Sequence, residues 1–154
     1  MSIISSDEIN ETRTCNLIAA YHATTYIADD GGQKVAVRLG ERSTAMDALL
    51  VRLGAAGGVF ITAHNPQSRL TGERENRAAA ESLRAEVETL ELLALPHLGI
   101  GDEGDWIEEG LFVLDLPLGT AVPLAECYGQ NAVVAVTRGG VAHLLPTRWM
   151  APPP

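Results

Sequence analysis

The chain has few of the residues that mark redox, zinc or nucleic-acid chemistry. Its two cysteines, Cys15 and Cys127, have no spacing typical of a zinc or redox site, so we expect two reduced and mostly buried thiols. Only eleven Lys and Arg residues oppose twenty Asp and Glu, and the basic residues are scattered. The net charge of −9 argues against nucleic acid as a partner, because phosphate backbones bind clustered basic residues.

Long apolar runs are also missing. No run approaches the ~18 residues that a membrane-spanning helix needs. The first residues have neither the basic region nor the apolar core of a signal peptide. The sequence therefore predicts a cytoplasmic protein with no membrane partner.

The composition is typical of one soluble globular domain, with 46% hydrophobic and 20% charged residues over 154 positions. Aromatic residues make up only 5%, so Leu, Val, Ile and Ala must form most of the core. We expect this domain at residues 9–146, between a loose segment at 1–8 and a disordered, Pro-rich tail at 147–154.

Hydrophobic periodicity and turn residues predict the order of the elements. Helices are expected at about 8–21, 44–53, 72–93 and 120–128, and strands at about 24–28, 34–39, 58–63, 93–100, 111–116, 131–136 and 141–145. Between 58 and 136 the order is βαββαβ, as in a ferredoxin-like fold. The predicted class is α+β: a mixed or mostly antiparallel sheet with helices packed on it. An N-terminal ββα unit and a C-terminal strand extend the core.

Strand directions in this topology bring four polar segments to one end of the sheet. These are the polar turn at 64–68 after strand 58–63, which we call the elbow, the acidic loop 101–109, the turn 129–131 and the segment 38–42. The loop 116–119 at the opposite end, with the sequence Leu-Pro-Leu-Gly, has no polar side chain. This asymmetry predicts a site at the polar end, because loops at one end of a sheet commonly carry function.

Eight residues of these segments and the following helix are candidates for ligand contact: Arg38, Asn65, Ser68, Asn76, Trp106, Glu108, Gln130 and Asn131. Amides, an Arg and a carboxylate suit a polar metabolite or a nucleotide-like compound. Whether the protein is an enzyme stays open, because no nucleophile–base pair is visible. Glu108 is the nominal catalytic residue, as a general base.

The same residues have structural interpretations. Asn65 and Ser68 are typical of a turn, and Asn76 can brace it. Trp106 can stack on a ligand or anchor its loop by burying its ring. Arg38 can bind an anion or pair with Glu108 or Glu109, which point to opposite faces if they lie in a strand. Gln130 and Asn131 are equally typical of a helix cap.

No metal or cofactor is predicted. The four histidines show no HxH or HExxH spacing, and the acidic residues of 102–109 do not match a calcium-binding loop. The sequence Gly99–Gly104 spells GxGxxG but leads into an acidic loop, which repels phosphate.

Several motifs, in the same order along the chain, resemble a bacterial family catalogued as domain of unknown function 3293. They are Phe60–Ser68, Glu75–Asn76, Gly104–Glu109 and Tyr128–Val134, with Tyr21–Tyr26 and Val37–Gly40 also fitting the pattern. The resemblance spans about residues 18–146 and implies no activity, substrate or cofactor. His64 stands where the family usually has an aromatic residue, which argues against a mechanism that requires His64.

The sequence thus favours a small-ligand site at one end of the sheet. The alternative is a protein-binding or regulatory module that uses the same surface or an exposed edge strand at 141–145. In a third interpretation the motif residues only maintain turns.

Overall fold

The structure, a computed structural model, describes residues 3–150 and is built around one seven-stranded sheet. Its strands are β1 (Thr24–Asp30), β2 (Gln33–Val37), β3 (Gly57–Thr62), β4 (Ala94–Gly101), β5 (Ile107–Leu114), β6 (Ala132–Thr137) and β7 (His143–Pro146). The helices are α1 (Ser6–His22), α2 (Thr44–Arg52), α3 (Glu73–Thr89) and α4 (Leu118–Cys127), with a short 3-10 turn, η1 (Pro66–Ser68). The predicted α+β class is confirmed.

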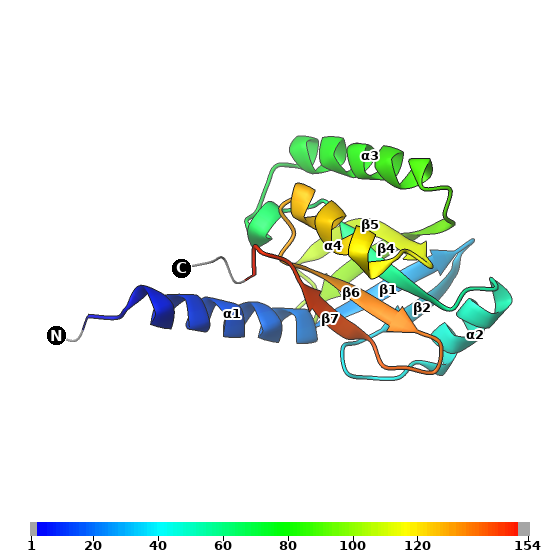
Figure 1. Ribbon diagram of the computed structural model, residues 1–154, viewed down its shortest axis with the longest axis horizontal. Helices are drawn as coiled ribbons and strands as arrows, with labels where there is room; N and C mark the ends of the chain where they lie inside the picture. Colours follow the sequence, from blue (N-terminus) through cyan, green and yellow to red (C-terminus); the bar gives the residue numbers. More distant parts are fainter. Residues whose placement is uncertain (1–2, 151–154) are drawn as a thin grey trace.

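The strands lie in the order β2-β1-β4-β5-β3-β6-β7, and each neighbouring pair is antiparallel. The sheet curls until the segments beside its two edges meet, where Leu39 bridges Ala142 and Arg42 bridges Val141 (Figure 1). One face of the sheet therefore becomes an enclosed inner face, and the other an outer face.

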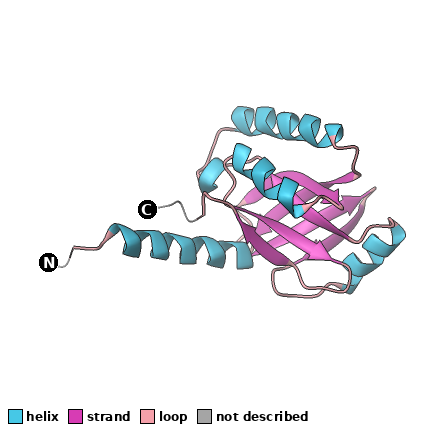
Figure 2. Cartoon of the chain, viewed as in Figure 1, coloured by secondary structure: helices cyan, strands magenta, loops and turns pink. Residues whose placement is uncertain are grey.

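Alternation along the strands places side chains on these two faces. On β3, Phe60 joins the inner cluster, whereas Val59 and Ile61 join the outer one. Helix α2 packs its buried Met46 and Leu49 into the inner cluster. Helices α3 and α4 cover the outer face together, on one side of the sheet in Figure 2.

Helix α1 projects from the body and reaches the sheet only with its C-terminal end (Figure 1). It contains no buried residue. Its first turn carries a capping box in which Ser5 and Glu8 bond each other's backbone amides. The helix therefore includes residues 6–8, which we had expected to be loose, because the cap satisfies amides that a loose segment would leave to water.

The chain beyond β7 also differs from the prediction of a disordered tail from residue 147. Arg13 donates to the carbonyl oxygens of Trp149 and Met150, both at 3.1 Å. The side chain of Thr147 is buried, and Met150 is 2% exposed. Residues 147–150 are thus packed beside α1, while the rest of the predicted tail, 151–154, lies outside the described residues.

Both cysteines are exposed, so the prediction of mostly buried thiols was wrong. Cys15 lies on α1, which has no buried side chain, and Cys127 ends α4, whose buried residues are Ala121 and Ala125. Among residues 3–150, no helix is both long and apolar enough to cross a membrane.

The segment 38–42 does not stay at the predicted polar end. Arg42 bridges Val141 and pairs with Asp47 at 3.1 Å, and Asp47 also accepts the amide of Gly139 in the β6–β7 turn. Only Arg38 lies at the polar end. The prediction failed because the segment crosses between the two edges of the curled sheet instead of forming a simple loop.

Candidate functional site

A pocket of about 620 Å³ opens on the inner face of the sheet, at the end where β3 leads into the elbow. Its walls come from the last turn of α1, the strands β1, β3, β4, β5 and β6, the elbow, and the β4–β5 loop. These segments are far apart in sequence, and the curl of the sheet brings them around one space.

The floor of the pocket is aromatic. Phe60 lies at the centre, with its ring centroid 4.8 Å from that of His97 and 5.9 Å from that of Tyr26. The rings of Tyr26 and His97 are stacked at 6.0 Å. Because Tyr26 and Phe60 are almost fully buried, this cluster gives the pocket a rigid apolar base.

His97 is 6% exposed, and one of its ring nitrogens is engaged by the chain. Its Nδ1 lies 3.2 Å from the carbonyl oxygen of Ile27, which can only accept, so Nδ1 carries the proton. Burial lowers the pKa of His97 to about 4, so the ring is neutral at pH 7. Nε2 is then an unprotonated acceptor, on the edge of the ring beside Gly99, which lines the pocket.

Glu108 stands on the wall beside this floor. It lies opposite Gly99 on the neighbouring strand, and its Oε2 accepts a hydrogen bond from Nδ2 of Asn65 at 3.2 Å. Burial raises the pKa of Glu108, while hydrogen bonds from Trp106 and Asn65 act in the opposite direction. Glu109 borders a different groove under α3, as expected for adjacent residues of one strand.

The elbow after β3 has an unusual backbone. Asn65, Gln67 and Ser68 have φ values of 48°, 55° and 59°, the left-handed region that side chains other than glycine rarely adopt. The Gln67 amide donates to the carbonyl of Gly129 at 2.7 Å. A Cβ on Gly129 would lie 2.9 Å from Cβ of Pro66, so glycine permits this close packing.

Asn65 and Asn76 hold the elbow to the start of α3. The backbone amide of Asn65 donates to Oδ1 of Asn76 at 2.9 Å. Oδ1 of Asn65 accepts from the Thr71 amide at 2.9 Å and from Nδ2 of Asn76 at 3.1 Å. Asn76 is therefore a brace, and Asn65 both closes the turn and contacts Glu108. The N-cap of α3 is Gly72, and the preceding Thr71 donates its amide to the elbow.

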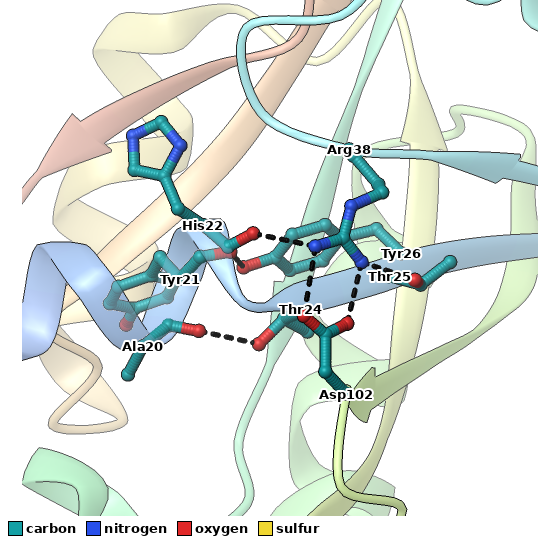
Figure 3. A network of polar contacts seen from close by, with 8 residues as sticks. All are labelled: Ala20, Tyr21, His22, Thr24, Thr25, Tyr26, Arg38 and Asp102. Atoms are coloured by element: carbon teal, nitrogen blue, oxygen red, sulfur yellow. Dashed lines mark hydrogen bonds and ion pairs between the residues drawn. The ribbon is translucent and has the colours of Figure 1, made fainter.

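Arg38 forms a clamp beside the pocket (Figure 3). Its guanidinium binds Asp102 bidentately at 2.7 and 3.1 Å, and it also donates to Thr25 and to the carbonyl of His22. The Arg38 guanidinium lowers the pKa of Asp102. Arg38 thus pairs with an acid, as one interpretation expected, but with Asp102 in place of Glu108 or Glu109. The clamp ties the end of α1 to β1 and the β4–β5 loop.

Gln130 and Asn131 also bond the chain, and both are buried. Nε2 of Gln130 donates to the carbonyl of His64 at 3.0 Å. Nδ2 of Asn131 donates to Oγ of Ser68 at 3.0 Å, and its Oδ1 accepts from Arg13. These amides hold the elbow, α1 and the start of β6 together.

Five of the eight candidate residues therefore line the pocket: Asn65, Ser68, Trp106, Glu108 and Gln130. Arg38, Asn76 and Asn131 lie behind this lining and bond to the residues that form it. Between residues 3 and 150, no group of three or more His, Cys, Asp or Glu is placed to hold a metal ion.

The sequence did not identify the aromatic floor of the pocket or the tyrosine of α1 that also lines it. Tyr21, from the last turn of α1, and the floor residues Tyr26 and His97 were not proposed as site residues. The available signal was the alternation of Leu95, His97 and Gly99, which places a histidine on the inner face of a buried strand.

No curated protein and no solved structure matches the chain. One family profile does, and it confirms the resemblance over part of the chain. Residues 61–133, which include the elbow, Glu108 and Gln130, match the family described as "Protein of unknown function (DUF3293)".

Proposed function

We propose that this protein binds a small organic molecule in the pocket at the polar end of the curled sheet. The observation that carries the proposal is a cavity of about 620 Å³ with an aromatic floor and a polar rim. Ligand sites commonly have volumes of roughly 300–1,000 Å³, an apolar lining and a few converging polar groups. Glu108, Asn65 and Gln130 supply those groups here.

The proposal is limited to binding and assigns no reaction. The hydroxyl of Ser68 is of the type that can act as a nucleophile. Its Oγ, however, accepts a hydrogen bond from the side-chain amide of Asn131, which is not a base that could activate it. Glu108 and His97 Nε2 can both accept a proton. Which bond would break depends on the molecule bound, so a catalytic role for Glu108 stays a hypothesis.

We also infer that residues 57–137 form a ferredoxin-like core. The strand order β4-β5-β3-β6 and the packing of α3 and α4 on one face support this inference. In such a core, the inner face is free to form a pocket when further strands curl around it.

A cavity-filling variant tests the pocket directly. A Cβ at Gly99 meets no atom closer than 3.6 Å, so Gly99→Val places its methyl groups toward the cavity without a backbone clash. We expect fragments that bind the wild type, detected by ligand-observed NMR, to lose at least about tenfold in affinity, which corresponds to about 1.4 kcal/mol.

The matched control is Gly119→Val, because Gly119 is exposed and has no neighbour within 4 Å of an added Cβ. It should bind every fragment as the wild type does. Unchanged binding in both variants, with both folded, would contradict the pocket as the binding site.

The second candidate is a protein-binding module. The positions of β2 and β7 at the two edges of the sheet support it, since edge strands can add a strand from a partner. The same variants separate the two functions, because a partner that pairs with an edge strand does not enter the pocket and would tolerate Gly99→Val.

A further inference from the structure

The charge around the pocket has one sign. Among the described residues that line it, Asp102, Glu103, Asp105 and Glu108 are acidic and none is Lys or Arg. The neighbouring Arg38 is already paired with Asp102. An anionic ligand would meet repulsion at this rim, whereas a cation would be attracted and concentrated there.

Glu108 has no cationic partner within residues 3–150. Its hydrogen-bond donors, Asn65 and Trp106, are neutral, and the ion pairs of this part of the chain involve other carboxylates. A partly buried carboxylate with only neutral donors is costly to desolvate. A bound cation would supply the missing countercharge.

His97 offers a second acceptor on the same face. Within residues 3–150, every fully buried side-chain polar atom has a hydrogen-bond partner, and His97 Nε2 has none there, so Nε2 keeps some accessible surface. Since a Cβ on the pocket-lining Gly99 would lie 3.7 Å from Nε2, we infer that this surface faces the pocket. Because Glu108 lies opposite Gly99, it is the diagonal neighbour of His97, at a typical Cβ separation of roughly 7 Å. A ligand can reach both acceptors at once.

The aromatic floor suits the remainder of such a ligand. Phe60 and Tyr26 present ring surface beside the two acceptors, and Tyr21 and Trp106 add further rings to the walls. Aromatic rings pack against apolar or aromatic groups and attract cations at their faces.

We propose that the pocket takes a small organic cation, with a protonated amine or amidine against Glu108, an N–H or O–H donor reaching His97 Nε2, and an aromatic body on Phe60 and Tyr26. This proposal rests on the proposed function and specifies the ligand class of that site. It narrows the polar metabolite predicted from the sequence and disfavours phosphorylated compounds.

A charge series of similar shape tests it with the full chain. Benzamidine and benzylamine are the cationic probes, benzamide and benzyl alcohol are the neutral ones, and benzoate is the anion. We expect the cations to bind at least about tenfold more tightly than the neutral compounds, and benzoate to bind most weakly, in titrations by NMR at pH 7.5.

Glu108→Gln removes the charge with little change of shape, and Glu109→Gln is the control on the opposite face. The first variant should lower the affinity for benzamidine and benzylamine by at least about tenfold and so abolish the preference for cations, whereas the control should keep that preference. The series in the wild type keeps the test valid if Glu108→Gln does not fold.

Equal binding of cations and neutral compounds, preference for benzoate, or no binding of benzamidine and benzylamine at millimolar concentration would overturn the cation proposal. The pocket itself would still stand if other fragments bind and Gly99→Val displaces them. Both proposals fall if no fragment responds to that variant.

Discussion

At the scale of single residues, the site depends on how burial changes proton affinity. Burial of His97 beside Tyr26 and Phe60 lowers its pKa and favours the neutral ring, and this outweighs the hydrogen bond that Nδ1 donates to the Ile27 carbonyl, which acts in the opposite direction. Burial also raises the pKa of Glu108, on the wall of the same pocket, but hydrogen bonds from Trp106 and Asn65 oppose this. Two hydrogen-bond acceptors, His97 and Glu108, therefore line one cavity.

The lowered pKa of His97 predicts a pH-dependent stability. The unfolded chain binds a proton at His97 below about 6.5, whereas the folded protein does so only below about 4. The free energy of unfolding should therefore fall as the pH decreases from 6.5 to 4, by about 3 kcal/mol from this residue, and be fully retained above 6.5.

Urea unfolding at several pH values measures this effect. His97→Gln retains an N–H donor but does not titrate, so its stability should decline less over the same range. His143→Gln, at an exposed histidine, should follow the wild type. Parallel pH profiles for the wild type and His97→Gln would contradict the buried neutral imidazole.

At the scale of elements, the elbow between β3 and α3 joins the fold to the site. Three residues with positive φ in four positions would not persist without support. The support comes from Asn76 at the start of α3 and from the turn before β6, where the Gly129 carbonyl accepts the Gln67 amide. The elbow is thus held from two elements, and this positions Asn65 against Glu108.

Substitution of two glycines distinguishes the stability cost of backbone strain from that of close packing at the elbow. Gly129 and Gly139 both have positive φ, 66° and 79°, but only Gly129 would place a Cβ against Pro66. Gly139→Ala should lower the free energy of unfolding by about 1 kcal/mol through backbone strain alone. Gly129→Ala should lower it by about 1–2 kcal/mol more, because its methyl group also meets Pro66.

Chemical denaturation of the two variants gives the comparison. An equal loss of stability would mean that the elbow moves away from residue 129 at no cost. In the packed arrangement, Gly129→Ala should also shift the NMR signals of the elbow residues, and Gly139→Ala should not.

At the scale of the whole molecule, the pocket exists because the sheet curls and because α1 covers part of the open end. Helix α1 has no fully buried residue, and it is held by the partly buried Tyr21, which packs against the inner cluster, together with polar contacts. Arg38 binds the carbonyl of His22 at the C-terminal end, and Arg13, near the middle of the helix, binds the carbonyls of Trp149 and Met150. Helix α1 is therefore expected to be the least stable element.

Hydrogen exchange tests this arrangement. Arg38→Gln should accelerate amide exchange in residues 20–25 by about tenfold and leave β3 unchanged, because the helix end opens locally without global unfolding. Arg42→Gln, which removes a different surface ion pair, with Asp47 of α2, is the control. Equal exchange in the two variants would show that the Arg38 clamp does not hold the helix.

Much of the fold could be predicted from the sequence because local periodicity and turn residues determine the elements. Ser43, a residue type typical of helix caps, caps α2, and the Gly31-Gly32 turn joins β1 to β2. The opposite orientations of Glu108 and Glu109 followed from strand alternation alone. Strand direction follows from the order of the elements, and it placed several polar segments at the same end of the sheet. These segments carry the elbow, Trp106, Glu108 and Gln130.

Other features depend on contacts between segments distant in sequence, and local patterns do not encode them individually. The partner of Arg38 is Asp102, from a loop 64 positions away, and that of Arg13 is the chain at 149–150. By itself the sequence determined the elements, their order and the end of the sheet that carries polar groups. Only the tertiary structure decided that the sheet curls, that His97 faces its interior, and that the two cysteines stay exposed, because burial depends on which surfaces the whole chain encloses.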